Sequence, residues 1–333
     1  MPGIIDETQF SILEMAACVS FTIFALLGII SNVINIKTFI AMGLKDSVTV
    51  SFLALSLFDL AYLVSTFCCT IALSFNVIEI SYYEHFPIEP FGVHVFFGHV
   101  VILINVTNTL TTTFIAVARC MCVAKPLHFK HSFTVKRTVI VMSGFAVFAL
   151  AIYTPLLAYM GMVERLDTKT NRSRPSLWLS PHKDSIKNIV WTLIQTVLPV
   201  VTEFIVLLCI AVMINSLLAA SKFRQASKIP VGNKEGNTGS FNDSSDKLSG
   251  KDIRVVKQVT LISVMYIVCN TPKVVISLVS FIEGEFSLRQ RYNNLYVCIN
   301  YFRMHFEIIN ASINTFVYYM YNRKFKDTLS WKC

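Results

Sequence analysis

The sequence predicts an all-α fold, a bundle of seven transmembrane helices followed by a short amphipathic eighth helix. Hydrophobic residues make up 54% of the 333 residues and charged residues only 15%, whereas soluble domains usually carry about a quarter of charged residues. Long apolar stretches recur along the chain with polar breaks between them. A soluble fold of this size could not bury so much apolar surface, so a lipid bilayer is the expected solvent.

Each of the seven apolar stretches is long enough to cross the hydrocarbon core, which takes about 20 helical residues. The first is not expected to be a cleavable signal peptide, because acidic residues precede it and its apolar stretch is too long. We divide the chain into an extracellular N-terminus (1–14), a transmembrane domain (15–321) and an eighth helix with a short cytoplasmic tail (322–333). The predicted spans are residues 15–40, 48–75, 91–123, 137–160, 186–219, 253–282 and 295–321.

The distribution of lysine and arginine predicts the orientation of the chain. These residues are concentrated in the loops after the first, third and fifth spans and in the C-terminal tail, while the N-terminus and the loop after the second span have none. The loop after the fourth span is an exception. Because basic loops stay cytoplasmic, the N-terminus is expected outside, and the net charge of +9 indicates a membrane rather than a nucleic-acid partner. The loop 221–250 is polar and rich in Gly and Ser, so we expect it to be flexible.

Several polar residues lie inside the predicted spans, where ionisable groups are costly and usually functional. Asp59 sits in the middle of the second span. A buried carboxylate needs partners, and either a packed amide network or a bound sodium ion would supply them. The amides at comparable depth are Asn32, Asn108, Asn310 and Asn314.

A second polar set lies nearer the outside and is expected to converge on a cavity. The spacing of its three histidines matches no metal-ligand motif, so no metal site is predicted. Most of the nine cysteines lie in apolar runs and are expected to be small core residues. The members of the set are His94, His99, Asn105, Lys273, Arg303, His305 and Glu307.

Short motifs at the ends of the spans carry a family resemblance. The third span ends in Ala118-Arg119-Cys120, followed by Pro126 and Leu127, which resembles the D/E-R-Y…P-L signature of rhodopsin-like G-protein-coupled receptors. Further matches follow in the family's order: Gly28…Asn32-Val33, Leu55…Asp59, Pro155, Pro199, Tyr266-x-x-Cys269-Asn270-Thr271-Pro272 (similar to F-x-x-C-W-x-P), Asn310-x-x-x-Asn314-Thr315-Phe316-Val317-Tyr318 (similar to N-P-x-x-Y) and Asn322-Arg323-Lys324-Phe325 at the eighth helix.

This resemblance covers nearly the whole chain and implies a plasma-membrane receptor with an extracellular ligand and a heterotrimeric G protein as partners. The pattern resembles a divergent invertebrate branch, similar to molluscan chemosensory receptors and FMRFamide-type neuropeptide receptors. Arg119 and Tyr318 would then serve G-protein coupling. The helix-six switch would comprise Tyr266, Cys269, Asn270 and Pro272.

The chain also departs from the family pattern. Ala118 stands where an acid normally precedes Arg119, Asn270 replaces a tryptophan, and Thr315 replaces the proline of the seventh helix. The family's usual disulfide to the second outer loop cannot form, because His94 occupies the helix-three position and that loop contains no cysteine. We therefore expect other contacts, around Trp178, to hold the loop.

The residues at the family's ligand positions narrow the choice of ligand. Val101 stands where amine receptors carry an aspartate, and Ile308 where opsins carry the retinal lysine, so the resemblance argues against both ligand classes. Lys273 would suit a carboxylate or another anionic group; alternatively it pairs with Glu307. The expected pocket residues are Val101, Asn105, Lys273, Met304 and Glu307.

Asp252 is a candidate partner for Arg119, since the neighbouring acid is missing. It lies twenty residues before Pro272, roughly 30 Å along a helix, and so at the inner face. Its alternative role is to cap the sixth helix. Asn171 begins a glycosylation sequon in the second outer loop.

Two other classes of protein remain as alternatives. A transporter or channel would be expected to show an internal repeat, and the sequence shows none. A receptor-like protein that has lost G-protein coupling is the other alternative, given Ala118, Asn270 and Thr315. No motif of an intramembrane enzyme is present, so no catalytic activity is predicted.

Overall fold

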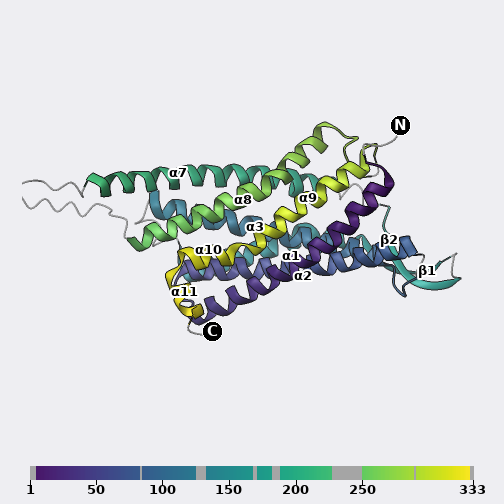
Figure 1. Ribbon diagram of the computed structural model, residues 1–333, viewed down its shortest axis with the longest axis horizontal. Helices are drawn as coiled ribbons and strands as arrows, with labels where there is room; N and C mark the ends of the chain where they lie inside the picture. The colour runs from purple at the N-terminus through teal and green to yellow at the C-terminus, as the bar shows by residue number, and fades with distance from the viewer. Residues whose placement is uncertain are drawn as a thin grey trace, which may run out of the picture.

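The computed structural model describes residues 5–82, 85–124, 133–167, 171–181, 188–226, 250–288 and 290–330, and the side chains of 167, 172, 217, 219–226 and 250–256 are not described. Long helices run side by side along the long axis of the molecule (Figure 1). The N-terminus and a small β-hairpin lie at one end of the bundle, and the C-terminus lies at the other, beside α11 (Figure 1). We call these the hairpin end and the α11 end.

The predicted all-α bundle is confirmed. Six helical segments are long and apolar enough to cross a membrane within the part of the chain that the structure describes, and the seventh is formed by two shorter helices. In chain order the helices are α1 (Glu7–Met42), α2 (Ser47–Tyr82), α3 (Pro90–Ala124), α5 (Val135–Ala158), a π-helical turn η1 (Thr192–Val197) that continues into α7 (Leu198–Ala226), α8 (Gly250–Ile282), α9 (Asn293–Ser312), α10 (Asn314–Tyr321) and α11 (Arg323–Ser330).

The helices keep large apolar side chains on the outside of the bundle. Ile23 is 53% exposed, Phe204 62% and Phe316 59%. In water such a surface would favour aggregation, whereas in a bilayer it faces a solvent as apolar as itself. The outer surface therefore supports the membrane-spanning assignment independently of helix length.

The seventh span differs from the others in composition. Its central helix α9 carries Arg303 and Glu307, and the short helix α10 follows after a break at Ile313. The two helices together cover the predicted span 295–321, although their polar side chains lower the mean hydropathy of the segment. These polar groups turn inward, as described below.

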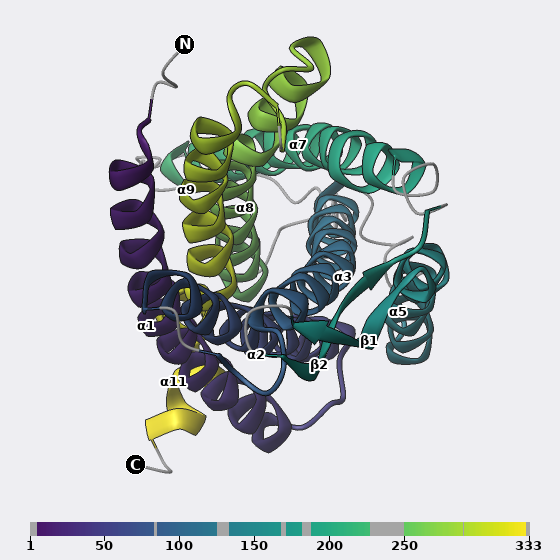
Figure 2. The same cartoon turned by 90° about the vertical axis from the view of Figure 1, so that its right-hand side faces the viewer.

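Between α5 and α7 the chain forms an antiparallel hairpin that the sequence did not predict. Strand β1 (Met160–Asp167) pairs with β2 (Arg172–Leu179), and Met160 lies opposite Leu179. Seen from the hairpin end, the two strands lie across α3 and α5 (Figure 2). The hairpin is the one departure from an all-helical chain among the described residues.

Two predicted boundaries shift in the structure. Helix α1 already begins at Glu7 because Asp6 caps it: its side chain accepts a hydrogen bond from the backbone N–H of Gln9 (2.7 Å), so about half of the predicted N-terminal segment is helical. Helix α7 continues to Ala226, into the loop predicted at 221–250. The remainder of that loop, 227–249, lies outside the described residues.

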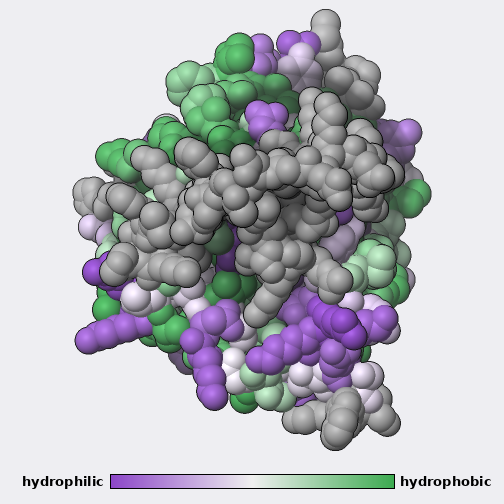
Figure 3. Space-filling model, turned by 90° about the vertical axis from the view of Figure 1, so that its left-hand side faces the viewer, coloured by the Kyte–Doolittle hydropathy of each residue, from purple (hydrophilic) through white to green (hydrophobic). Residues whose placement is uncertain are grey.

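The predicted eighth helix is confirmed as α11. Phe325 is fully buried on its inner side, while Arg323 and Lys326 are exposed, which gives the short helix one apolar and one basic face. It lies at the end of the molecule where hydrophilic side chains gather along the lower part of the described surface (Figure 3).

Candidate functional site

A cavity of about 430 Å³ lies among α2, α3, η1, α8 and α9 at the hairpin end. This volume lies in the range of small-molecule sites. Its walls combine apolar side chains, such as Ile102 and Ile276, with a few polar groups. All five residues that the sequence predicted for a ligand pocket line it: Val101, Asn105, Lys273, Met304 and Glu307.

One wall of the cavity is a π-helical turn, which the sequence did not predict. Residues Thr192–Val197 form it, and both Gln195 within this turn and Trp191 just before it line the cavity. The Gln195 carbonyl accepts a hydrogen bond from Ser277 Oγ (2.8 Å), so a side chain of α8 satisfies this backbone group. Such turns often occur at functional sites, and here the turn links the fifth span to α8.

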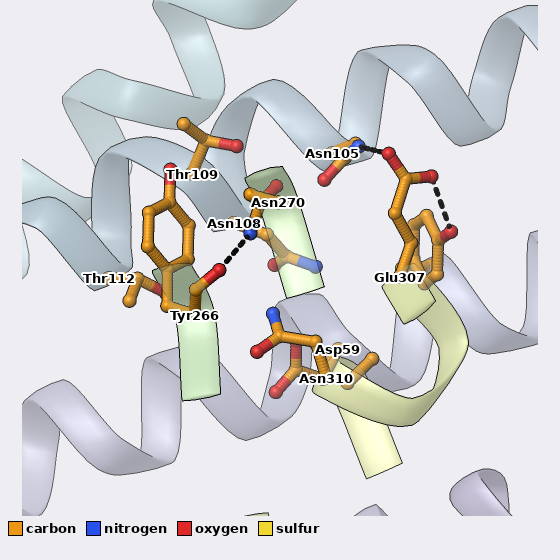
Figure 4. A pocket seen from close by; sticks show the side chains of 11 residues that line it. Asp59, Asn105, Asn108, Thr109, Thr112, Tyr266, Asn270, Glu307 and Asn310 are labelled. Carbon is orange, nitrogen blue, oxygen red and sulfur yellow. Dashed lines mark hydrogen bonds between the residues drawn. The ribbon is translucent and has the colours of Figure 1, made fainter. Parts of the chain in front are cut away.

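A charge cluster around Glu307 forms the floor of the cavity. Glu307 Oε1 accepts a hydrogen bond from Arg303 Nη1 (2.8 Å) and another from Asn105 Nδ2 (3.2 Å), and Lys273 Nζ lies 3.8 Å away. Oε2 accepts one from Tyr62 Oη (3.2 Å). Figure 4 shows the Asn105 amide pointing at the Glu307 carboxylate. Of the two alternatives for Lys273, the pairing with Glu307 is therefore observed.

The polar set predicted near the outside converges on this cavity except for one member. His94 and His99 line it, but His305 does not. The His305 Nε2 lies 2.7 Å from Ser20 Oγ of α1, and its ring packs on Phe21. The prediction was wrong for His305 because residues two apart on a helix point in nearly opposite directions, whereas Arg303 and Glu307, four apart, share a face.

Deeper in the bundle, Asp59 borders a second, much smaller cavity of about 10 Å³, the space for about one water molecule. Asn314 Nδ2 donates a hydrogen bond to Asp59 Oδ2 (2.8 Å). Asn108, Asn270 and Asn310 also line the cavity, and Figure 4 shows Asn310 beside Asp59 with Asn108 and Asn270 close by. Amide side chains therefore surround the carboxylate, and Asn314 donates a hydrogen bond to it.

Asn32 does not join these amides, contrary to the prediction. Its side-chain amide donates instead to the carbonyl oxygens of Ala311 (2.8 Å) and Gly28 (3.0 Å). Asn32 lies on the α1 face that packs against α9. Its amide therefore bonds to the backbone of the seventh span and not to Asp59.

The helix-six residues lie along α8 between the core and the two cavities. Tyr266 is buried, with its hydroxyl 3.3 Å from Thr202 Oγ1 of α7, and its carbonyl accepts a hydrogen bond from Asn270 Nδ2 (2.9 Å). Cys269 is buried beside them. Pro272 lies inside α8 and lacks the N–H that would bond to the preceding turn, which weakens the helix at this level.

At the α11 end, the residues predicted for coupling are buried. Arg119 is 6% exposed on α3. Tyr318 packs against the rings of Phe39 and Phe52, each with centroids 5.0 Å away, and against Phe325. The backbone of Asp252 belongs to α8, but its side chain, and so the predicted bridge to Arg119, lies outside the described residues.

The seventh span breaks at Ile313 without the proline that the family carries nearby. Thr315 stands in its place, with its hydroxyl against Ser31 Oγ and donating to Asn35 Oδ1 (2.8 Å). Ser31 Oγ also donates to the carbonyl of Ser312 (2.8 Å). Gly28 allows this approach, because a Cβ there would collide with the Ser312 side chain. Hydroxyls and amides of α1 therefore hold the break.

Ionic and polar contacts anchor the hairpin, and the described cysteines are free thiols. Arg174 Nη1 lies 2.7 Å from Glu79 Oε1 of α2. The Glu89 carboxylate accepts a hydrogen bond from the Leu177 backbone N–H (2.6 Å). These contacts lie in the strand around Trp178, as expected, but its neighbours make them, and the Trp178 side chain itself is 38% exposed.

Asn171 occupies the turn between β1 and β2. It is exposed and adopts a left-handed backbone conformation with φ of 53°, which asparagine tolerates better than most residues. This placement suits the predicted glycosylation site, which stays a prediction.

Comparison with known proteins gives one clear result. A search of curated proteins found no match. The family model described as 7 transmembrane receptor (rhodopsin family) matches residues 16–318, nearly the whole chain. It makes this chain a multi-pass membrane receptor, with an extracellular ligand and a G protein as its general partners. The chain belongs to the rhodopsin family of seven-transmembrane receptors.

Proposed function

We propose that this receptor binds an extracellular ligand, a neuropeptide or a small chemosensory cue, in the 430 Å³ cavity and activates a heterotrimeric G protein through outward movement of α8. One observation carries the proposal. The Lys273–Glu307 pair joins α8 to α9 across the floor of the cavity, so a ligand in the cavity acts directly on a contact that holds α8. A ligand that favours one position of α8 shifts the equilibrium between two states of the bundle.

The proposed orientation has the N-terminus and hairpin outside the plasma membrane and α11 inside. It is supported by exposed basic residues at the α11 end, among them Lys37, Lys45, Arg323 and Lys324, because basic segments stay cytoplasmic. In this orientation the large cavity faces the extracellular side. The likeness to molluscan chemosensory and FMRFamide-type receptors belongs to the same proposal.

We further propose a sodium ion as the partner of Asp59 in the inactive state. The carboxylate and the amides of Asn108 and Asn310 border the small cavity beside it, and oxygen ligands of this kind suit a hard cation. Asn108 Oδ1 is buried there without a hydrogen-bond partner among the described residues.

The gate at the α11 end is proposed to include a salt bridge between Arg119 and Asp252. If it restrains the inactive state, Asp252→Ala should raise basal G-protein signalling several-fold, because a lost restraint of about 1 kcal/mol shifts a two-state equilibrium about fivefold. Basal nucleotide exchange in transfected cells measures this. Unchanged basal signalling at equal surface expression would remove Asp252 from the gate and leave it as a helix cap.

The proposed function is tested by exposing transfected cells to crude tissue extract, with and without prior protease digestion, and measuring G-protein activation. We expect activation by one of the two preparations. Loss after digestion indicates a peptide ligand, and survival indicates a small chemosensory molecule. An Arg119→Ala variant, present at equal surface levels, should respond much less. Silence toward extracts of many tissues, despite surface expression, would contradict coupling and favour a receptor-like protein that has lost it.

A further inference from the structure

The large cavity contains more positive than negative charge. Its described lining residues include one carboxylate, Glu307, and two basic side chains of lysine and arginine, Lys273 and Arg303. Lys273 is 4% exposed and Glu307 7%. Buried charges are costly unless they are paired, and the cluster has one cation in excess. An anionic group placed in the cavity would balance it.

The donors of Arg303 are only partly used. Its Nη1 donates to Glu307 at 2.8 Å, but its Nε is buried and has no hydrogen-bond partner among the described residues. A guanidinium presents its donors as a planar fork that matches the two oxygens of a carboxylate. A buried donor without an acceptor is unfavourable, so this side of Arg303 is suited to an acceptor brought by a ligand.

The ammonium of Lys273 is available in the same way. It lies 3.8 Å from Glu307 Oε1, an ion pair beyond hydrogen-bond length. Glu307 Oε1 already accepts hydrogen bonds from Arg303 and Asn105, and Oε2 accepts one from Tyr62. The carboxylate is well supplied with donors, and Lys273 makes no hydrogen bond to another side chain or carbonyl among the described residues, so its N–H groups can bind a second anion.

We propose that the cavity recognises ligands by a carboxylate, which Arg303 and Lys273 bind beside Glu307 while the apolar walls hold the rest of the ligand. The proposal rests on the proposed function, and it names the chemical class of the ligand. The same carboxylate can come from a small organic acid or from the free C-terminus of a peptide. A cationic ligand would meet the same two cations and is disfavoured.

Purified full-length receptor in detergent, without G protein, tests the proposal with sodium benzoate as the probe. Benzamide is the neutral control of the same shape, and sodium chloride keeps the ionic strength constant. Benzoate should raise the Tm as its concentration increases, since a ligand of the folded state stabilises it, and benzamide should not. N-acetylphenylalanine and its amide form a second pair, and tighter binding of this acid than of benzoate would point to a peptide end.

Variants locate the effect. Arg303→Gln should weaken the apparent affinity for benzoate about tenfold, the loss of one charge-assisted contact. Arg291→Gln is the matched control, because Arg291 pairs with Glu285 on the exposed surface and does not line the cavity; benzoate should act on it as on the unchanged receptor. If Arg303→Gln does not fold, the benzoate and benzamide comparison decides alone.

Three results would overturn the proposal: equal effects of benzoate and benzamide, an equal effect of sodium chloride alone, or an undiminished effect of benzoate on folded Arg303→Gln. None of them bears on G-protein coupling. Conversely, carboxylate binding by a receptor that never activates a G protein would contradict the proposed function and leave this inference standing.

Discussion

Replacing Glu307 with alanine is expected to destabilise the receptor by about 3–5 kcal/mol, the usual effect of removing one partner from a buried ion pair. The two cations that Glu307 contacts, Arg303 and Lys273, would remain in the bundle without their anion. Tyr62 and Asn105 would also lose their acceptor. A fall in the Tm of purified receptor measures the effect.

The matched control is Glu285→Ala, which breaks an exposed pair with Arg291 and should change the Tm little, because surface ion pairs contribute little to stability. Adding Lys273→Met to Glu307→Ala should restore part of the lost stability by removing one stranded charge. Equal Tm values for Glu307→Ala and Glu285→Ala would show that the cluster does not hold the bundle together.

Replacing Arg174 with alanine is expected to loosen the hairpin. The variant loses the 2.7 Å contact with Glu79, whose side chain is only 14% exposed and whose Oε2 is already buried without a partner among the described residues. Hydrogen bonds to charged groups contribute about 1.5–3 kcal/mol, so the free energy of local opening of β1 and β2 should fall by about that amount. Faster hydrogen exchange of the strand amides measures it.

Arg165→Ala is the control for this experiment, since Arg165 lies opposite Arg174 on the same hairpin but is exposed. The double variant Glu79→Arg with Arg174→Glu, which swaps the two charges, should slow the hydrogen exchange of the strand amides again. A reducing agent should leave the unmodified hairpin unchanged, because the segment contains no cysteine. If Arg165→Ala and Arg174→Ala opened the hairpin equally, the ionic anchor would not be what holds it.

Patterns within a single helix made most of the architecture predictable. The apolar lengths indicated the spans, and the resemblance of Asn322-Arg323-Lys324-Phe325 to the family's eighth helix indicated α11. Spacing along one helix could also have joined Arg303 to Glu307, and it could have placed Tyr62, three residues after Asp59, on the same face of α2. The same rule, applied to His305, would have removed it from the cavity.

Contacts between distant segments could not be read in this way. Arg174 contacts Glu79 because the hairpin folds back over α2 and α3. The sequence does not predict how a loop of this kind folds over the helices. The choice between Asp59 and the α9 backbone as partner of Asn32 depends on how α1 is rotated against its neighbours. The π turn at Gln195 is accompanied by a hydrogen bond from Ser277 Oγ to the Gln195 carbonyl. These two residues lie on different spans, so the sequence could not pair them.

The break in the seventh span has a mechanical consequence. A proline bends a helix in every state, because its ring and its missing N–H are part of the covalent chain. The break seen here depends instead on side chains of another helix, Ser31, Asn32 and Asn35 of α1. Thr315, unlike proline, has a backbone N–H that can donate a helix hydrogen bond, so α9 and α10 could join into one straight helix. The bend of the seventh span and its distance from α1 are therefore thermodynamically linked. Contacts with α1 stabilise the bent form of the seventh span.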